Sequence, residues 1–159
     1  MTAGNRVDSR TVELDKPDFD FTPPPPDRRP TLPEPLPVRL ISVADVRLPC
    51  PADPTLGPAL DDFYVRLLQF RRLPSDEHHH FFMSDNHALI LQAQSRPVQH
   101  DRIAPTMIEV DHRQPIRQHL VEHQIEHEWM RGLTAGGDYL LLQDPAGNWV
   151  GILERSTLR

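Results

Sequence analysis

The sequence predicts an α+β domain made of two βαβββ modules that pair their sheets into an incomplete barrel, preceded by a proline-rich tail. Three observations lead to this fold class. Nine of the 18 prolines lie within residues 1–37. From Val38 onward, apolar and polar residues alternate in short runs that are typical of strands. The order of strands and helices in the first half of the chain then recurs in the second half, at a period of about 60 residues.

Residues 1–37 are expected to form a flexible tail. The run Pro23, Pro24, Pro25, Pro26 and the prolines after it remove backbone donors and fix φ, so neither a helix nor a central strand fits there. Polyproline II stretches and disorder are the expected states. The segments PPPDRRP and PEPLP suit a polyproline-binding partner. A simple spacer is the alternative.

Residues 38–159 are expected to form the domain, with the first module at about residues 38–96. Val46, Leu48 and Cys50 alternate with less apolar neighbours and predict a half-buried strand. Pro58 predicts the start of a helix, because its missing donor costs nothing in the first turn. Three strands are expected to follow, at residues 70–73, 78–84 and 88–93, separated by turns.

The second module, at about residues 103–155, repeats this order. Thr106, Ile108 and Val110 predict a strand, and Pro115 predicts the start of a helix. Strands are expected at residues 125–130, 139–143 and 149–153, joined by two glycine-containing turns. One side of every strand would line a concave sheet face, which is a usual place for a ligand.

Composition argues against several classes of partner. A net charge of −6 gives no basic footprint for nucleic acid, and no stretch approaches the roughly 20 apolar residues of a membrane span. Cys50 is the only cysteine, so no intrachain disulfide forms and a reducing compartment suits the chain. The first ten residues lack the apolar core of a signal peptide. We therefore expect a cytoplasmic protein with no nucleic-acid or membrane partner.

Two segments resemble motifs of a known superfamily. FYVRLLQF, at residues 63–70, resembles the helix-to-strand signature of the vicinal-oxygen-chelate superfamily, which commonly reads FYxxLLGF. QDPAGNWVGILE, at residues 143–154, is similar to its final hairpin and strand, commonly DPxGNxxEL. The superfamily includes glyoxalases, bleomycin-resistance proteins and extradiol dioxygenases. The resemblance covers about residues 38–154 and implies the same fold.

The resemblance also implies where a metal would bind. In the superfamily, His, Gln or Glu ligands face inward from the first and last strand of each module. The corresponding opening positions here are Asp45 and Pro105, and the closing positions are Leu89, or Gln92 with a shifted register, and Gly151. Because Pro105 and Gly151 cannot coordinate through a side chain, too few ligands remain. We therefore predict that the metal site is degenerate and that no cofactor is bound.

Strand alternation identifies the residues expected on the concave face. These are Asp45, Arg47, Met107, Glu109, Trp149 and Gly151. We predict that Arg47, Gln92, Met107 and Trp149 bind a ligand, since a guanidinium clamps carboxylates or phosphates and an indole stacks. Asp45, Glu109 and His127 are the candidate catalytic residues. The alternative for Arg47 is a simple ion pair with Asp45 or Glu109.

The clustered histidines are expected to be structural. Neighbours on a strand point to opposite faces, so of His78, His79 and His80 at most the first and last could share an ion. His119 and His123 have helical spacing, but the helix is expected to end before a third ligand could join them. Cys50 points to the core in this register, which argues against a nucleophile.

The leading hypothesis is a protein that binds a small organic ligand in its concave face without a metal, and that forms a homodimer. The first alternative is a lyase, isomerase or dioxygenase that uses a divalent metal at a displaced site, with Asp45, Gln92, Glu109 or His127 as ligands. The second is a dimeric interaction domain whose proline-rich tail recruits a partner.

Overall fold

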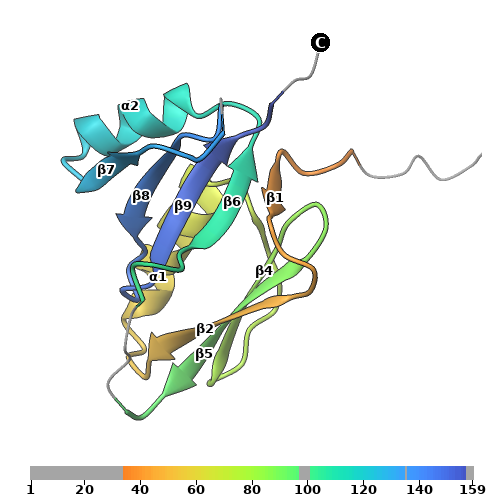
Figure 1. Ribbon diagram of the computed structural model, residues 1–159. Coiled ribbons are helices and arrows are strands. Elements are labelled where there is room, and N and C mark those ends of the chain that lie inside the picture. Colours follow the sequence, from red (N-terminus) through yellow and green to blue (C-terminus); the bar gives the residue numbers. More distant parts are fainter. Residues whose placement is uncertain (1–33, 97–100, 135, 157–159) are drawn as a thin grey trace, which may run out of the picture. The chain divides into compact units, whose positions relative to one another are not determined.

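The computed structural model describes residues 34–96, 101–134 and 136–156, so nearly all of the predicted tail lies outside the described residues. The elements, labelled in Figure 1 where there is room, are β1 (Val38–Leu40), β2 (Val46–Pro51), α1 (Leu56–Asp61), η1 (Asp62–Leu67), β3 (Arg71–Arg72), β4 (His79–Met83), β5 (Ala88–Gln94), β6 (Thr106–Val110), α2 (Gln114–Glu122), β7 (His127–Met130), β8 (Tyr139–Gln143) and β9 (Trp149–Glu154). No helix in these three ranges is long and apolar enough to cross a membrane.

The two modules share one strand order. The first sheet has the order β2-β5-β4-β3, and the second has β6-β9-β8-β7 with β1 added beside β6. In each module the first strand runs parallel to the last, β2 with β5 and β6 with β9, and the last three strands are antiparallel. The predicted duplication of βαβββ modules, in two sheets that do not close into a barrel, is therefore confirmed.

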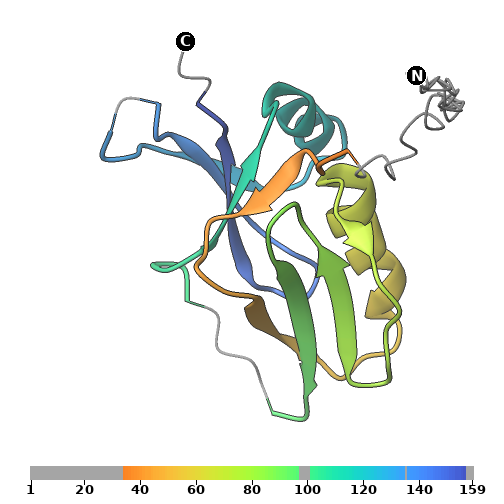
Figure 2. The same ribbon diagram turned by 90° about the vertical axis from the view of Figure 1, so that its right-hand side faces the viewer.

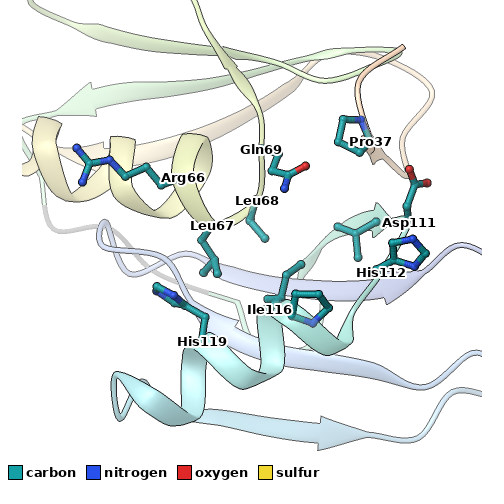
Figure 3. Close-up of a pocket in the computed structure, with 11 residues that line it drawn as sticks. Pro37, Arg66, Leu67, Leu68, Gln69, Asp111, His112, Ile116 and His119 are labelled. Carbon is teal, nitrogen blue, oxygen red and sulfur yellow. The ribbon is translucent and has the colours of Figure 1, made fainter. Parts of the chain in front are cut away.

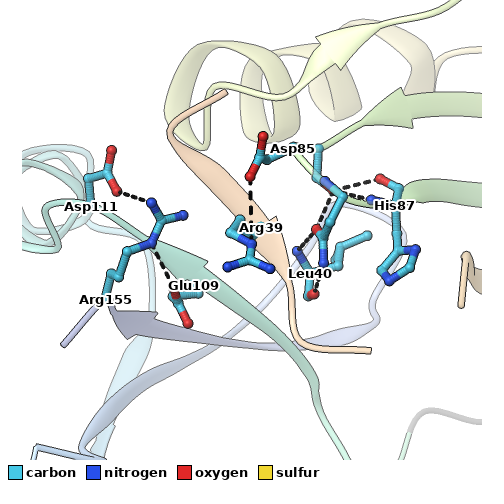
Figure 4. A network of polar contacts seen from close by, with 9 residues as sticks. Arg39, Leu40, Asp85, His87, Glu109, Asp111 and Arg155 are labelled. Atoms are coloured by element: carbon cyan, nitrogen blue, oxygen red, sulfur yellow. Dashed lines mark hydrogen bonds and ion pairs between the residues drawn. The ribbon is translucent and has the colours of Figure 1, made fainter. Parts of the chain in front are cut away.

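Strand β1 was not predicted as a separate element. It pairs with β6 in the second sheet, with Leu40 opposite Ile108. It is also held by the β4–β5 turn of the first module, because Asn86 accepts the Leu40 N–H at 3.1 Å and donates to the Leu40 carbonyl at 2.9 Å. Figure 4 shows these contacts beside an ion pair between Arg39 and Asp85. A strand of three residues is too short for its alternation to be recognised in the sequence.

Both helices contribute to one core. Figure 2 shows α1 and η1 beside the β4–β5 pair, while α2 buries Ile116 and Leu120 in the core that also holds strands of the second sheet. Fully buried side chains come from both modules, including Leu60, Tyr64, Phe82, Leu89, Leu91, Ile108, Leu120, Leu140, Val150 and Ile152. Because these buried strand residues recur at every second position, they form one apolar, helix-facing side of each sheet. The side away from the helices is the one expected from the sequence to be the concave face.

The helix ends differ in detail from the prediction. The helix that begins at α1 continues as π-helix η1, so that the Leu68 N–H bonds to the Phe63 carbonyl at 3.1 Å. Gln69 and Gln124 follow the two helices with φ of 63° and 53°, a left-handed conformation that favours glycine. Strand β7 begins at His127, two residues later than expected, because the turn through Gln124 comes first.

Candidate functional site

The register of the second sheet fixes which side chains share its concave face. Trp149 pairs with Gln143, and Gly151 lies between Met107 and Leu141. Leu153 lies between Glu109 and Tyr139 in the next row. The intervening residues on β9 are fully buried in the core. Trp149, Gly151, Met107 and Glu109 therefore lie on the side away from the helices.

The first module corrects one expectation about the closing-strand position. Met107 pairs with Gly151 in the second module as Arg47 pairs with Ile90 in the first, so Ile90 is the equivalent of Gly151. Leu89 is fully buried in the core, on the opposite side of the strand. Gln92 lies two residues beyond Ile90, on the same side but opposite Pro49. Neither residue proposed from the sequence takes the equivalent position.

The positions at which the superfamily resemblance implies metal ligands do not suit a metal. They carry Asp45, Ile90, Pro105 and Gly151, of which only Asp45 has a donor side chain, and its Oδ1 accepts the Ala88 N–H at 2.8 Å. A Cβ built on Gly151 would lie 2.5 Å from Met107 Sδ, so the thioether fills the space that a longer side chain would need. In the part of the chain that the structure describes, no three His, Cys, Asp or Glu side chains are grouped to hold a metal ion.

The charged candidates do not converge. Glu109 Oε1 accepts from Arg155 Nε at 2.7 Å, and the same guanidinium reaches Asp111 at 3.1 Å, as Figure 4 shows. The Glu109 carboxylate is therefore already paired with Arg155, the residue that follows β9. Arg47 is exposed and makes no ion pair with Asp45 or Glu109, so the simple pairing considered for it is wrong.

His127 lies on the helix side of β7, where it pairs with Leu142, while Glu109 lies on the concave side. Its Nδ1 is 2.8 Å from the Ile125 carbonyl oxygen. Because a carbonyl only accepts, Nδ1 must carry the hydrogen. Trp129 shares this side of β7, and the Arg113 guanidinium stacks over its ring at 4.4 Å.

The other titratable candidates are tied to local partners. His80 Nδ1 accepts from the Arg72 guanidinium at 3.1 Å, and burial, together with that charge, lowers the pKa of His80. His79 pairs with Asp76 at 2.9 Å. Burial raises the pKa of Cys50 to about 11, with smaller contributions from Asp144 and Asp53. Such a thiol stays protonated and unreactive near neutral pH.

One hollow lies between the helices. It has a volume of about 320 Å³ and is bordered by η1 and the start of α2, as Figure 3 shows. Its walls combine apolar groups such as Leu67 and Ile116 with Arg66, Gln69 and His119. The sequence does not predict this hollow, because the hollow depends on how the helices of the two modules approach one another.

A second hollow, of about 440 Å³, lies at the β7 edge of the second sheet. We call it the Trp149 hollow; it is lined by Ile125, Glu126, His127, Glu128, Leu141, Gln143 and Trp149. Two of these lining residues contact Arg102, whose guanidinium lies 5.1 Å from the centroid of the Trp149 ring and forms an ion pair with Glu128. Arg102 and Glu128 are each about half exposed. A planar cation therefore lies on an indole and beside a carboxylate.

Alternation in the sequence predicts Trp149 on this face but does not predict its contacts with charged residues. Glu126 and Glu128 are two positions apart, which is the spacing of one strand face, and this was the available signal. Arg102 belongs to the segment between the modules, and its contact with Trp149 depends on the path of that segment. Among the described residues, Glu126 has no basic partner within 4.0 Å.

No family model matches the sequence, and no curated protein matches it. Solved structures do match. A glyoxalase family protein from Bacillus anthracis has a TM-score of 0.58 and 15% identity, covering 74% of this chain and 99% of its own. Lactoylglutathione lyase from Agrobacterium tumefaciens has a TM-score of 0.52 and 18% identity, covering 72% and 93%.

A third similar structure is that of a genomically encoded fosfomycin resistance protein from Listeria monocytogenes. It has a TM-score of 0.56 and 8% identity, covering 73% of this chain and 94% of its own. Likeness at these identities concerns the fold and does not extend to activity. The fold implied by the FYVRLLQF and QDPAGNWVGILE motifs is thus confirmed: the chain has the glyoxalase-like fold of the vicinal-oxygen-chelate superfamily.

Proposed function

We propose that the chain binds a small organic ligand in the Trp149 hollow, on the concave face of its second sheet, without the superfamily's metal. The observation that carries this proposal is the planar guanidinium of Arg102 lying 5.1 Å from the Trp149 ring, beside a hollow of about 440 Å³. Sites for small molecules commonly have volumes of roughly 300–1,000 Å³ and combine aromatic walls with a few polar groups.

The lining residues support binding of this kind. Trp149 offers a stacking surface, Leu141 is fully buried beneath the hollow, and Gln143 places an exposed amide beside them. The absence of a metal, as proposed here, is supported by the four positions at which the resemblance implies ligands, since Pro105, Ile90 and Gly151 have no donor side chain. Metal content by elemental mass spectrometry tests it, and near-stoichiometric metal in untagged protein would overturn it.

The two tryptophans provide a direct test of ligand binding. The chain has only Trp129 and Trp149, which lie on opposite faces of the second sheet. A small-molecule library would be screened by following both indole N–H signals in two-dimensional NMR spectra. We expect ligands that shift the Trp149 signal and leave that of Trp129 in place.

Matched variants complete the test. Trp149→Ala should weaken binding of any such ligand at least roughly tenfold, since an aromatic wall is lost. Trp129→Ala removes an indole from the other face and should leave the affinity unchanged. Ligands that shift only Trp129, or equal losses in both variants, would contradict the proposed site.

We also propose that the chain forms a homodimer. Val43 and Ile103 are almost fully exposed, at 100% and 94%, and Ile41 is 48% exposed. Val43 follows β1 and Ile103 precedes β6, the two strands that pair antiparallel. Light scattering should give twice the chain mass, and Val43→Ser with Ile103→Ser should shift it to the monomer. A wild-type monomer at micromolar concentration would refute the dimer.

A further inference from the structure

A cation from the chain itself, Arg102, contacts two of the residues that line the Trp149 hollow, Trp149 and Glu128. We infer that the ligand of this hollow is a planar organic cation, such as an amidinium, a guanidinium or a ring-bearing ammonium, and that Arg102 takes its place when the site is empty. This inference rests on the proposed function, because it names the class of ligand for the same site.

The aromatic surface suits a cation. An indole ring carries negative charge density on its face and is the strongest cation–π partner among the side chains. In the structure this face is used by the Arg102 guanidinium, at 5.1 Å from the ring centroid. A ligand of similar shape and charge would make the same contact.

The charges of the hollow favour a cation over an anion. Glu126 and Glu128 both line it, and Arg102 neutralises only Glu128. Glu126 has no basic group within 4.0 Å among the residues that the structure describes. An anion in the hollow would be repelled by the Glu126 carboxylate, and the positive charge of Arg102 is already neutralised by Glu128. A cation in the hollow could form an ion pair with Glu126. It could form a second ion pair with Glu128 once it had displaced Arg102.

Arg102 is held weakly enough to be displaced. Its side chain and that of Glu128 are 49% and 51% exposed, so water screens their attraction. The polar lining is completed by Gln143, which lies opposite Trp149 in the register; its Nε2 donates to the Gly147 carbonyl at 3.1 Å, and its Oε1 can accept from an N–H of the ligand. The two glutamates and the Gln143 oxygen are therefore the polar groups that would recognise the ligand.

Three probes of equal shape separate the charge classes: benzamidine, benzamide and benzoate carry charges of +1, 0 and −1 on the same ring. Each would be titrated into the full chain while the Trp149 indole signal is followed. We expect benzamidine to bind roughly tenfold more tightly than benzamide, and benzoate to bind most weakly. Glu128→Gln should reduce the affinity for benzamidine roughly tenfold.

The substitution Arg102→Gln tests whether Arg102 competes with the ligand for the hollow. If it competes with the ligand, its removal should raise the affinity for benzamidine roughly fivefold. Arg66→Gln removes the same charge from an exposed site on η1, where Arg66 pairs with Asp62, and controls for the change in net charge. The benzamidine affinity of Arg66→Gln should equal that of the wild type.

The opposite results would overturn the inference. Tighter binding of benzoate, lost in Arg102→Gln, would show an anion site in which Arg102 is a contact. An unchanged benzamidine affinity in Arg102→Gln would show that Arg102 does not compete with the ligand. Library ligands that shift Trp149 but are neutral or anionic would overturn the ligand class and leave the proposed function standing. If no compound of any charge shifts Trp149, the proposed function itself fails.

Discussion

Tyr64 on η1 donates its hydroxyl hydrogen to Asp144 Oδ2, in the β8–β9 turn, at 2.7 Å across 80 positions of the chain. Asp144 Oδ1 also accepts the Asn148 N–H at 2.8 Å, and the Asn148 amide donates to the Pro49 carbonyl at 2.9 Å. The turn of the second module is thereby hydrogen-bonded to the helix and the first strand of the first. The two sequence motifs that indicated the fold are the two segments that this network joins.

Tyr64→Phe should lower the free energy of unfolding by about 2 kcal/mol. The phenol is fully buried, and its loss leaves the buried Asp144 carboxylate with one donor fewer. Urea unfolding followed by circular dichroism measures the change. Tyr139→Phe is the matched control, because the part of the chain that the structure describes gives the Tyr139 hydroxyl no hydrogen bond. Equal losses in both variants would argue against the Tyr64–Asp144 bond.

Asp144 should make stability depend on pH. Burial raises the pKa of Asp144, although hydrogen bonds from Asn148 and Tyr64 oppose the shift. The folded chain therefore holds this proton more tightly than the unfolded chain does. The contribution of Asp144 is fully present below the ordinary aspartate pKa and is lost as pH rises through the raised folded pKa.

The comparison with Asp144→Asn isolates this contribution. The free energy of unfolding of the wild type, minus that of the variant, should fall as pH rises through this interval and then level off. Asp53 and Asp76, whose pKa values are lowered mainly by hydrogen bonds, are present in both proteins and cancel in the difference. A difference that grows with pH would contradict the raised pKa.

Glycine at either helix end should stabilise the fold. Gln124 has φ of 53° where the Ile125 N–H bonds to the Leu120 carbonyl, which is the Schellman arrangement that glycine favours. Gln124→Gly, and Gln69→Gly at the equivalent position, should each add about 1 kcal/mol to the free energy of unfolding. Gln118→Gly, inside α2, should instead lose about 1 kcal/mol. Thermal unfolding distinguishes these outcomes, and a loss at all three positions would refute the argument.

Gly151 should not tolerate a side chain while Met107 remains. A Cβ there would lie 2.5 Å from Met107 Sδ and 3.1 Å from Tyr139 Cδ2, so Gly151→Ala should cost about 1–3 kcal/mol. Met107→Ala in the same chain should recover part of that loss, giving a favourable coupling in a double-mutant cycle. Additive effects of the two substitutions would show that the thioether is not the obstacle.

The helices and strands are predictable where apolar residues recur at a regular spacing in the sequence. Both helices, the three strands after each, and the duplication could be predicted because alternation and helical spacing are local properties of the chain. Strand β1 cannot be recognised in the sequence, because three residues are too few to show alternation and its partner β6 is far along the chain. The sequence predicts Leu89 or Gln92 at the closing position of the first module, whereas pairing with β2 places Ile90 there; this register is a tertiary property.

The candidate site was predictable only in part. Trp149 was identified from alternation, and Pro105 and Gly151 were recognised as unable to coordinate a metal from their chemistry alone. Arg102, Glu126 and Glu128 meet Trp149 only in the folded chain, where Arg102 contacts both Trp149 and Glu128. The sequence by itself determined which residues alternate and which lack donors, because these are properties of neighbouring positions. Tertiary structure decided which charges meet, because that depends on contacts between distant segments.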